Sequence, residues 1–204
     1  MKTNLQKIRK MTALAILIAL VAVLQVLSLV PINPIVGITL ALVPIVVGAI
    51  LYGPAAGAVL GAVMGVVVFI SVVGGQAGAL STAMLNLNPI VTFLVCIFKS
   101  TIAGFLSGVV YRALAKTGKE TLAIIAAAIV CPIVNTGLFL SALLTVFYSV
   151  AASFAEATSS PSMIYFVFVL ILGVNFILEF VINSALSPAI VRIVSVVRKN
   201  KLAK

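Results

Sequence analysis

The sequence contains no histidine, no tryptophan and only three acidic residues among its 204. Without histidine or clustered carboxylates, it lacks the side chains that hold catalytic metals and that serve most often as general bases. It also lacks the Gly-x-Ser-x-Gly motif of many hydrolases and the phosphate-binding loop of P-loop ATPases. We therefore predict that the chain is not an enzyme, that it has no catalytic residues, metal site or cofactor, and that any energy from ATP comes through another chain.

Charged residues are also scarce, at 8% of the chain, whereas hydrophobic residues make up 64% and the mean hydropathy is +1.39. Soluble domains contain about 25% charged and about 45–50% apolar residues. A helical membrane crossing takes roughly 20 residues, so about six crossings with short links use up the chain. The predicted fold is therefore an all-α integral membrane protein, a single transmembrane domain over residues 1–204. The two cysteines, Cys96 and Cys131, lie in apolar runs, which predicts buried thiols and no disulfide framework.

The predicted membrane helices are the six apolar segments 11–30, 36–51, 54–73, 89–114, 121–149 and 162–197. Three helix starts carry a local signal, because a residue suited to capping precedes a proline at Gly53-Pro54, Asn88-Pro89 and Ser160-Pro161. The first apolar run lacks a clean small-residue cleavage site, so it is predicted to be a retained helix and not a signal peptide.

The 13 Lys and Arg residues give a net charge of +10, and all but Lys99 fall in three clusters, within 2–10, 112–119 and 192–204. Basic residues are not interleaved with exposed aromatic residues as a nucleic-acid groove requires. Basic links stay on the cytoplasmic side of a membrane. A cytoplasmic N-terminus then places the links 31–35, 74–88 and 150–161, which contain no Lys or Arg, outside the cell. Both termini are therefore predicted to be cytoplasmic.

Small residues recur at helical spacing in two of the predicted helices. Gly53, Gly57, Gly61 and Gly65 stand four apart and form one face, and Ala15 and Ala19 form an Ala-x-x-x-Ala pair with Ala22 close to the same face. Small residues let membrane helices approach closely. The glycines are interpreted as internal helix packing, whereas the alanines are open to two interpretations, internal packing or the docking of another helix.

Polar side chains within the membrane segments form two stripes. Asn88, Thr92 and Lys99 lie within about 40° of one another on the fourth helix at 3.6 residues per turn. Asn175, Glu179 and Asn183 recur every four residues on the sixth, and Asn135 lies in the fifth. A charge at the bilayer centre costs roughly 2.5–3.5 kcal/mol on insertion scales, so Lys99 and Glu179 need compensation. Either they form an ion pair that ties helices together, or the stripes line an outward-opening pocket in which Lys99 receives a ligand carboxylate.

Four features of the sequence, in this order, carry a family resemblance. They are the basic start followed by Ala15-x-x-x-Ala19, the Gly- and Ala-rich stretch 38–65, Asn88-Pro89 after a glycine-containing outer link, and the basic link 112–119. With these features the chain resembles, over nearly its whole length, the substrate-binding S components of energy-coupling factor (ECF) vitamin transporters.

The resemblance implies a six-helix protein of the bacterial plasma membrane that binds a vitamin near its outer face. It also implies partners: the transmembrane coupling protein EcfT and two ATPase subunits, EcfA and EcfA', with Ala15 and Ala19 facing EcfT. Within the family the chain is most similar to the pantothenate group, through Asn88-Pro89 and the cation ten residues after that proline. The expected substrate contacts are Asn88, Thr92, Lys99, Asn135, Asn175 and Glu179.

Other functions remain open on the sequence alone. Biotin, folate, riboflavin or cobalamin could replace pantothenate as the vitamin. A stand-alone secondary carrier or channel would normally show internal repeats with broken helices, and no convincing repeat is present. A purely structural membrane protein would need no outward-facing polar pocket.

Overall fold

The computed structural model describes residues 2–28 and 40–167 and the isolated positions 169, 181, 188, 190–192, 195 and 196; residues 2–6 are described by their backbone alone. The elements are α1 (Lys2–Leu27), α2 (Leu42–Tyr52), α3 (Pro54–Val73), α4 (Ala79–Leu87), α5 (Pro89–Ala115), α6 (Glu120–Thr145), α7 (Tyr148–Ala157) and α8 (Met163–Tyr165). The link 31–35, the stripe Asn175, Glu179 and Asn183, and most of the sixth predicted membrane helix lie outside the described residues.

Four of the described helices, α1, α3, α5 and α6, are long and apolar enough to cross a membrane. The all-helical membrane fold predicted from composition is thereby confirmed. Helix α2 has 11 residues. At 1.5 Å per residue it spans about 16 Å, roughly half of the hydrocarbon layer, so its described part does not cross a bilayer by itself.

Local sequence signals place the starts of the helices. Gly53 has a φ of 98°, a conformation that costs glycine little, and Pro54 follows at the first position of α3. The Asn88 side chain accepts a hydrogen bond from the Val91 N–H at 3.1 Å, which caps α5. The prediction for Ser160-Pro161 is wrong, because it is Ser162, in extended backbone, whose hydroxyl oxygen accepts from the Tyr165 N–H at 3.1 Å and caps α8.

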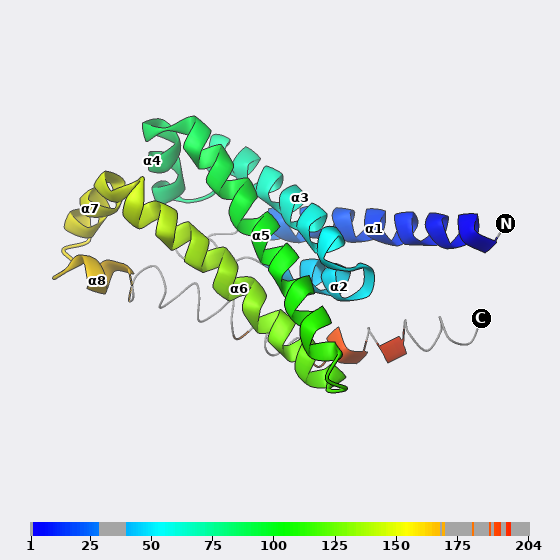
Figure 1. Cartoon of the computed structure of the whole chain (residues 1–204). Coiled ribbons are helices and arrows are strands. Elements are labelled where there is room, and N and C mark those ends of the chain that lie inside the picture. The colour runs from blue at the N-terminus through cyan, green and yellow to red at the C-terminus, as the bar shows by residue number, and fades with distance from the viewer. Residues whose placement is uncertain are drawn as a thin grey trace.

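Helices α3 and α5 pack with their backbones in contact, and Figure 1 shows them side by side. A Cβ atom on Gly57 would overlap the carbonyl oxygen of Gly104, and one on Gly61 would overlap that of Ser100. On Gly65 it would lie 2.6 Å from the carbonyl oxygen of Cys96. The seam between α3 and α5 is therefore solid and leaves no space for a ligand.

The main core lies where α2 packs between α3, α5 and α6. It contains fully buried side chains of α2, among them Leu42, Ile45 and Val46, together with Leu60 of α3 and Cys131 of α6. Helix α1 covers α2 and α3 from the other side. A short apolar helix thus fills the centre of the bundle, which explains why α2 is buried along its length although it does not span the layer.

Two of the predicted outer links are helical. Helix α4 lies within the glycine-rich link 74–88, and most of α7 lies within the link 150–161. Leu80 and Met84 of α4 pack with Phe147 and Ala151 near α7 in a second buried cluster. Figure 1 shows both helices at the end of the molecule opposite the N-terminus, here called the capped end.

Candidate functional site

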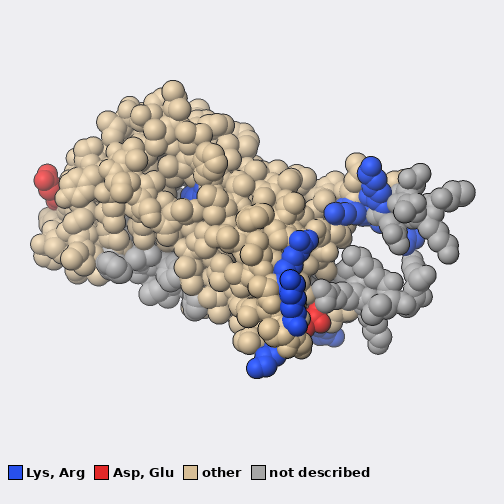
Figure 2. Space-filling model, in the orientation of Figure 1, with Lys and Arg blue, Asp and Glu red and all other residues tan. Residues whose placement is uncertain are grey.

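Basic residues lie at the end of the molecule opposite the cap, here called the basic end. They include Lys7, Arg9 and Lys10 near the start of α1, Arg112 in the last turn of α5, and Lys116 and Lys119 in the link to α6. Figure 2 shows the blue side chains gathered on the same side as the N-terminus, whereas the capped half is almost uniformly uncharged. Basic residues that stand far apart in the sequence therefore lie together at one end of the molecule.

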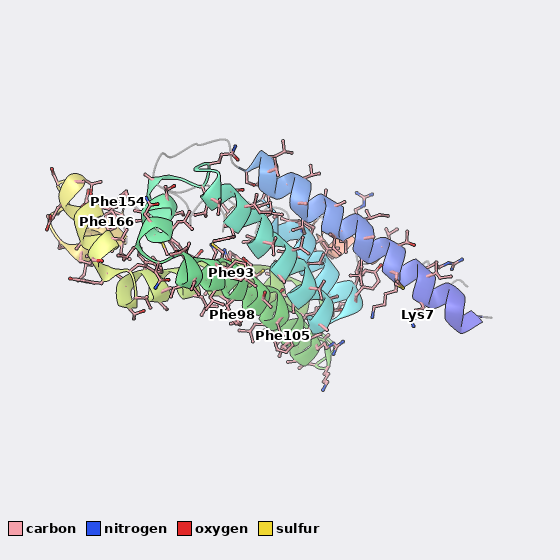
Figure 3. The ribbon with its side chains drawn as sticks, turned by 90° about the horizontal axis from the view of Figure 1, so that it is seen from above. Lys7, Phe93, Phe98, Phe105, Phe154 and Phe166 are labelled. Carbon is pink, nitrogen blue, oxygen red and sulfur yellow. The ribbon has the colours of Figure 1, made fainter. Side chains whose placement is uncertain are left out.

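The large apolar side chains follow the same axis. In Figure 3, Lys7 marks the basic end, Phe154 and Phe166 mark the capped end, and Phe93, Phe98 and Phe105 follow α5 between them. Phe98 is 56% exposed and Phe105 is 45% exposed. An exposed aromatic row on a long apolar helix suits contact with lipid, so this face of α5 is turned away from the interior.

Lys99 lies in the middle of α5 and is half-buried. Its Nζ atom is 5.0 Å from the centre of the Phe139 ring on α6, a cation–π contact that partly offsets the cost of the charge. The two carboxylates in the described part, Glu120 and Glu156, lie at the first residue of α6 and on α7. Glu179 lies outside the described residues, so the predicted Lys99–Glu179 pair stays a prediction.

Asn135 of α6 is 4% exposed and pairs with Ser100, a residue that no pattern in the sequence singles out. Ser100, fully buried on α5, donates its hydroxyl hydrogen bond to Asn135 Oδ1 at 3.3 Å; the same hydroxyl lies 3.3 Å from the Cys96 carbonyl oxygen of its own helix. Asn135 and Phe139 are one helical turn apart, and Lys99 and Ser100 are neighbours. The structure therefore brings Lys99 and Asn135 to neighbouring positions on one seam, between α5 and α6.

Asn88 and Thr92 lie at the capped end of α5, about 16 Å and about 10 Å along the helix from Lys99. Asn88 is exposed and its side chain caps the helix, while Thr92 is 1% exposed and donates to the Asn88 carbonyl oxygen at 2.9 Å. Both groups thus have local structural roles. Lone pairs of the Asn88 and Thr92 oxygens remain for further hydrogen bonds.

Two more hydrogen bonds cross the same seam nearer the basic end. Ser107 Oγ donates to the Ala127 carbonyl oxygen at 3.0 Å, and the Tyr111 hydroxyl lies 3.4 Å from Glu120 Oε1. Together with the Ser100–Asn135 bond they join α5 to α6 at three levels. Part of the polar content of these two helices therefore joins α5 to α6.

The small residues separate into two groups in the structure. Gly57, Gly61 and Gly65 face α5, whereas Gly53 lies at the turn between α2 and α3 against the Arg112 guanidinium. Ala15 and Ala19 are exposed on α1, and Ala22 is half-buried. The alanine face of α1 is thus open to an outside contact, whereas the glycine face of α3 is filled.

The fold and the site define a class: a multi-pass helical membrane protein with one basic end and buried polar groups between its helices. The sequence matches the family model for the ECF transporter, substrate-specific component, over residues 9–191, and the chain belongs to that family. It is a transport subunit of the cell membrane and binds the substrate of an ECF importer; such components associate with EcfT and EcfA ATPases. Searches among curated proteins and among solved structures gave no match.

Proposed function

We propose that this S component binds pantothenate, or another small anionic vitamin, at the seam between α5 and α6. Lys99 receives the carboxylate, and Asn135 is the nearest neutral polar group among the predicted contacts. Asn88 and Thr92 contribute from the capped end of α5, and Asn175 and Glu179 from the sixth membrane segment. The capped end faces the outside of the cell, and both termini are cytoplasmic.

The observation that carries this proposal is the half-buried Lys99 ammonium, 5.0 Å from the Phe139 ring centre. A cation at mid-membrane depth is costly and usually marks a functional site. A ring face stabilises an ammonium only in part, so a bound carboxylate would gain a charge-assisted hydrogen bond without the full cost of desolvating the lysine. A single cation suits a vitamin with a single carboxylate.

The neighbouring polar groups suit the rest of such a ligand. Asn135 donates through its amide nitrogen and accepts through its oxygen, which is the chemistry that hydroxyl and amide groups of pantothenate require. The chain has no tryptophan and 7% aromatic residues, which argues against a stacking site for a flat-ring vitamin.

Delivery of the vitamin rests on the partners. The exposed Ala15 and Ala19, with Ala22 beside them, form the contact with EcfT, because small side chains let another helix approach α1 closely. EcfA and EcfA' then supply the ATP hydrolysis for which this chain has no residues.

A ligand screen on the purified protein in lipid nanodiscs tests the substrate. Pantothenate, biotin, folate, riboflavin and cobalamin are added singly, and the melting temperature is recorded, since a ligand that binds only the folded state raises it. We expect the largest rise with pantothenate. A rise with riboflavin or cobalamin alone would contradict the anionic-vitamin proposal and leave the family assignment intact.

A further inference from the structure

Phe139 of α6 contacts both the proposed site and the capped end of the molecule. Its ring centre lies 5.0 Å from the Lys99 Nζ atom on α5. The same side chain packs against the second buried cluster, here called the cap cluster, whose members include Leu80 and Met84 of α4 and Ala151 of α7. One ring thus touches the cation of the proposed site and the apolar packing that joins the two cap helices.

Helical spacing arranges the residues along the seam in the same order on both helices. On α6, Asn135, Phe139 and Leu143 follow one another at intervals of four, and Leu143 is a fully buried member of the cap cluster. On α5, Val95 precedes Lys99 by four residues and also packs against the cap cluster. Helix α5 begins and α6 ends at the capped end, so both lines become apolar in that direction. Lys99 therefore lies where the polar part of the seam meets the cap cluster.

A ring at this place limits where the Lys99 ammonium can go. A lysine has a long flexible stem, and in a membrane helix such a side chain bends toward the nearest polar interface. The face of the Phe139 ring attracts the ammonium and so favours the position in the seam. The ammonium has three N–H donors, so a substrate carboxylate can accept from it while the ring stays in contact. The ring therefore keeps the lysine ready for an anionic substrate.

The ring can hold the ammonium only if its own position is fixed. The cap cluster is tightly closed, since Leu80 and Phe147 are fully buried and Met84 is 2% exposed. Close-packed interiors leave few alternative positions to a side chain that packs against them. The packing of α4 on α7 therefore fixes the Phe139 ring, and a void in that packing would release it.

We infer that Phe139 is a positioning residue that couples the cap to substrate binding: the cap cluster holds its ring, and the ring holds the Lys99 ammonium where a carboxylate arrives. This inference rests on the proposed function, in which Lys99 receives the carboxylate of the substrate. When the ammonium spends less time in the binding position, the affinity falls by the same fraction. The affinity for an anionic substrate therefore depends on the packing of α4 and α7, although the cation lies on α5.

Fluorinated phenylalanines at position 139 test the contact between the ring and the ammonium. Each fluorine withdraws electron density from the ring face and changes the ring size little, so a cation–π contact weakens in steps whereas apolar packing is kept. We expect pantothenate affinity in nanodiscs to fall from phenylalanine to the trifluoro ring, by about two- to thirtyfold in all, the range of cation–π contacts. Constant affinity over this series would overturn the inference. The same series at Phe105, 45% exposed on α5, is the matched control and should leave affinity unchanged.

A void in the cap cluster tests the step from the cap to the ring. Met84→Ala on α4 should lower pantothenate affinity severalfold in the natural background, because the ring is released. In Phe139→Leu the same change should have no further effect, since the ring on which it acts is gone. If Met84→Ala does not fold, Met84→Val leaves a smaller void and replaces it. Equal losses in the two backgrounds, or no loss in the natural one, would overturn the inference.

The contact between ring and ammonium is also measurable without a ligand. Lys99→Met, Phe139→Leu and the double variant form a double-mutant cycle on unfolding of the ligand-free protein. We expect a coupling that changes the unfolding constant by about two- to thirtyfold, and additive effects would overturn the inference. If this coupling is found and the natural protein binds no pantothenate, it is the proposed substrate that fails, while the positioning of Lys99 by Phe139 stands.

Discussion

Gly61 of α3 lies against the carbonyl oxygen of Ser100, and the hydroxyl of the same serine reaches Asn135 of α6. One residue of α5 thus contacts α3 through its backbone and α6 through its side chain. Lys99 is the next residue along the chain. The backbone position of Lys99 is therefore fixed by packing on two sides, as a preorganised binding group requires.

The contact at Gly61 predicts that Gly61→Val destabilises the protein by about 1–3 kcal/mol, because added methyl groups force α3 and α5 apart. Unfolding by denaturant in mixed micelles measures the change. Gly137→Ala is the control, since the space around Gly137 on α6 is open and alanine is the better helix former. Equal stabilities for the two variants would show that the seam is looser than described.

The Ser100–Asn135 hydrogen bond predicts energetic coupling between the two helices. Ser100→Ala, Asn135→Leu and the double variant form a double-mutant cycle, which isolates the pairwise interaction. We expect a coupling energy of about 0.6 kcal/mol and at most about 1.7 kcal/mol, the range of such bonds in membrane proteins. Additive effects of the two single changes on unfolding would indicate that the pair does not interact.

Asn88 has two possible contributions, helix capping and ligand contact, and one pair of variants separates them. Asn88→Ser keeps a capping oxygen, whereas Asn88→Ala removes it and should lower stability by about 1 kcal/mol. If Asn88 also contacts the vitamin through its amide, both variants should weaken binding in a titration. Weaker binding in Asn88→Ala alone would reduce its role to capping.

The alanine face of α1 predicts a docking surface for EcfT. Replacing both Ala15 and Ala19 by leucine should abolish co-purification with EcfT and the ATPases while pantothenate binding is kept, because both positions are exposed and far from Lys99. Leu20→Phe adds bulk elsewhere on the exposed part of the helix and should leave the complex intact. Retention of the complex by the double leucine variant would place the EcfT contact on another surface.

The sequence predicted the long helices best where an apolar run meets clear end signals. Helix α3 has the predicted bounds because Gly53-Pro54 starts it and Gly74 ends it. The cap helices were missed because they are short and mix apolar with polar residues. The spacing of Leu80 and Met84 is that of a helix, yet the stability of α4 comes from contact with α7, which no local pattern reveals.

Of the residues at the candidate site, the sequence singled out Lys99 but not Ser100 or Phe139. Lys99 stands out because a cation in an apolar run is unusual. Ser100 and Phe139 are ordinary residues in membrane helices, and their importance depends on how α5 and α6 are rotated against each other.

The most direct test of this account is isothermal titration of pantothenate into the natural protein, Lys99→Arg and Lys99→Met in nanodiscs. The account predicts binding by the natural protein, a loss of at least about tenfold in Lys99→Met through the missing charge-assisted hydrogen bond, and a smaller loss in Lys99→Arg. Pantothenate binding of equal strength by the natural protein and Lys99→Met would contradict it.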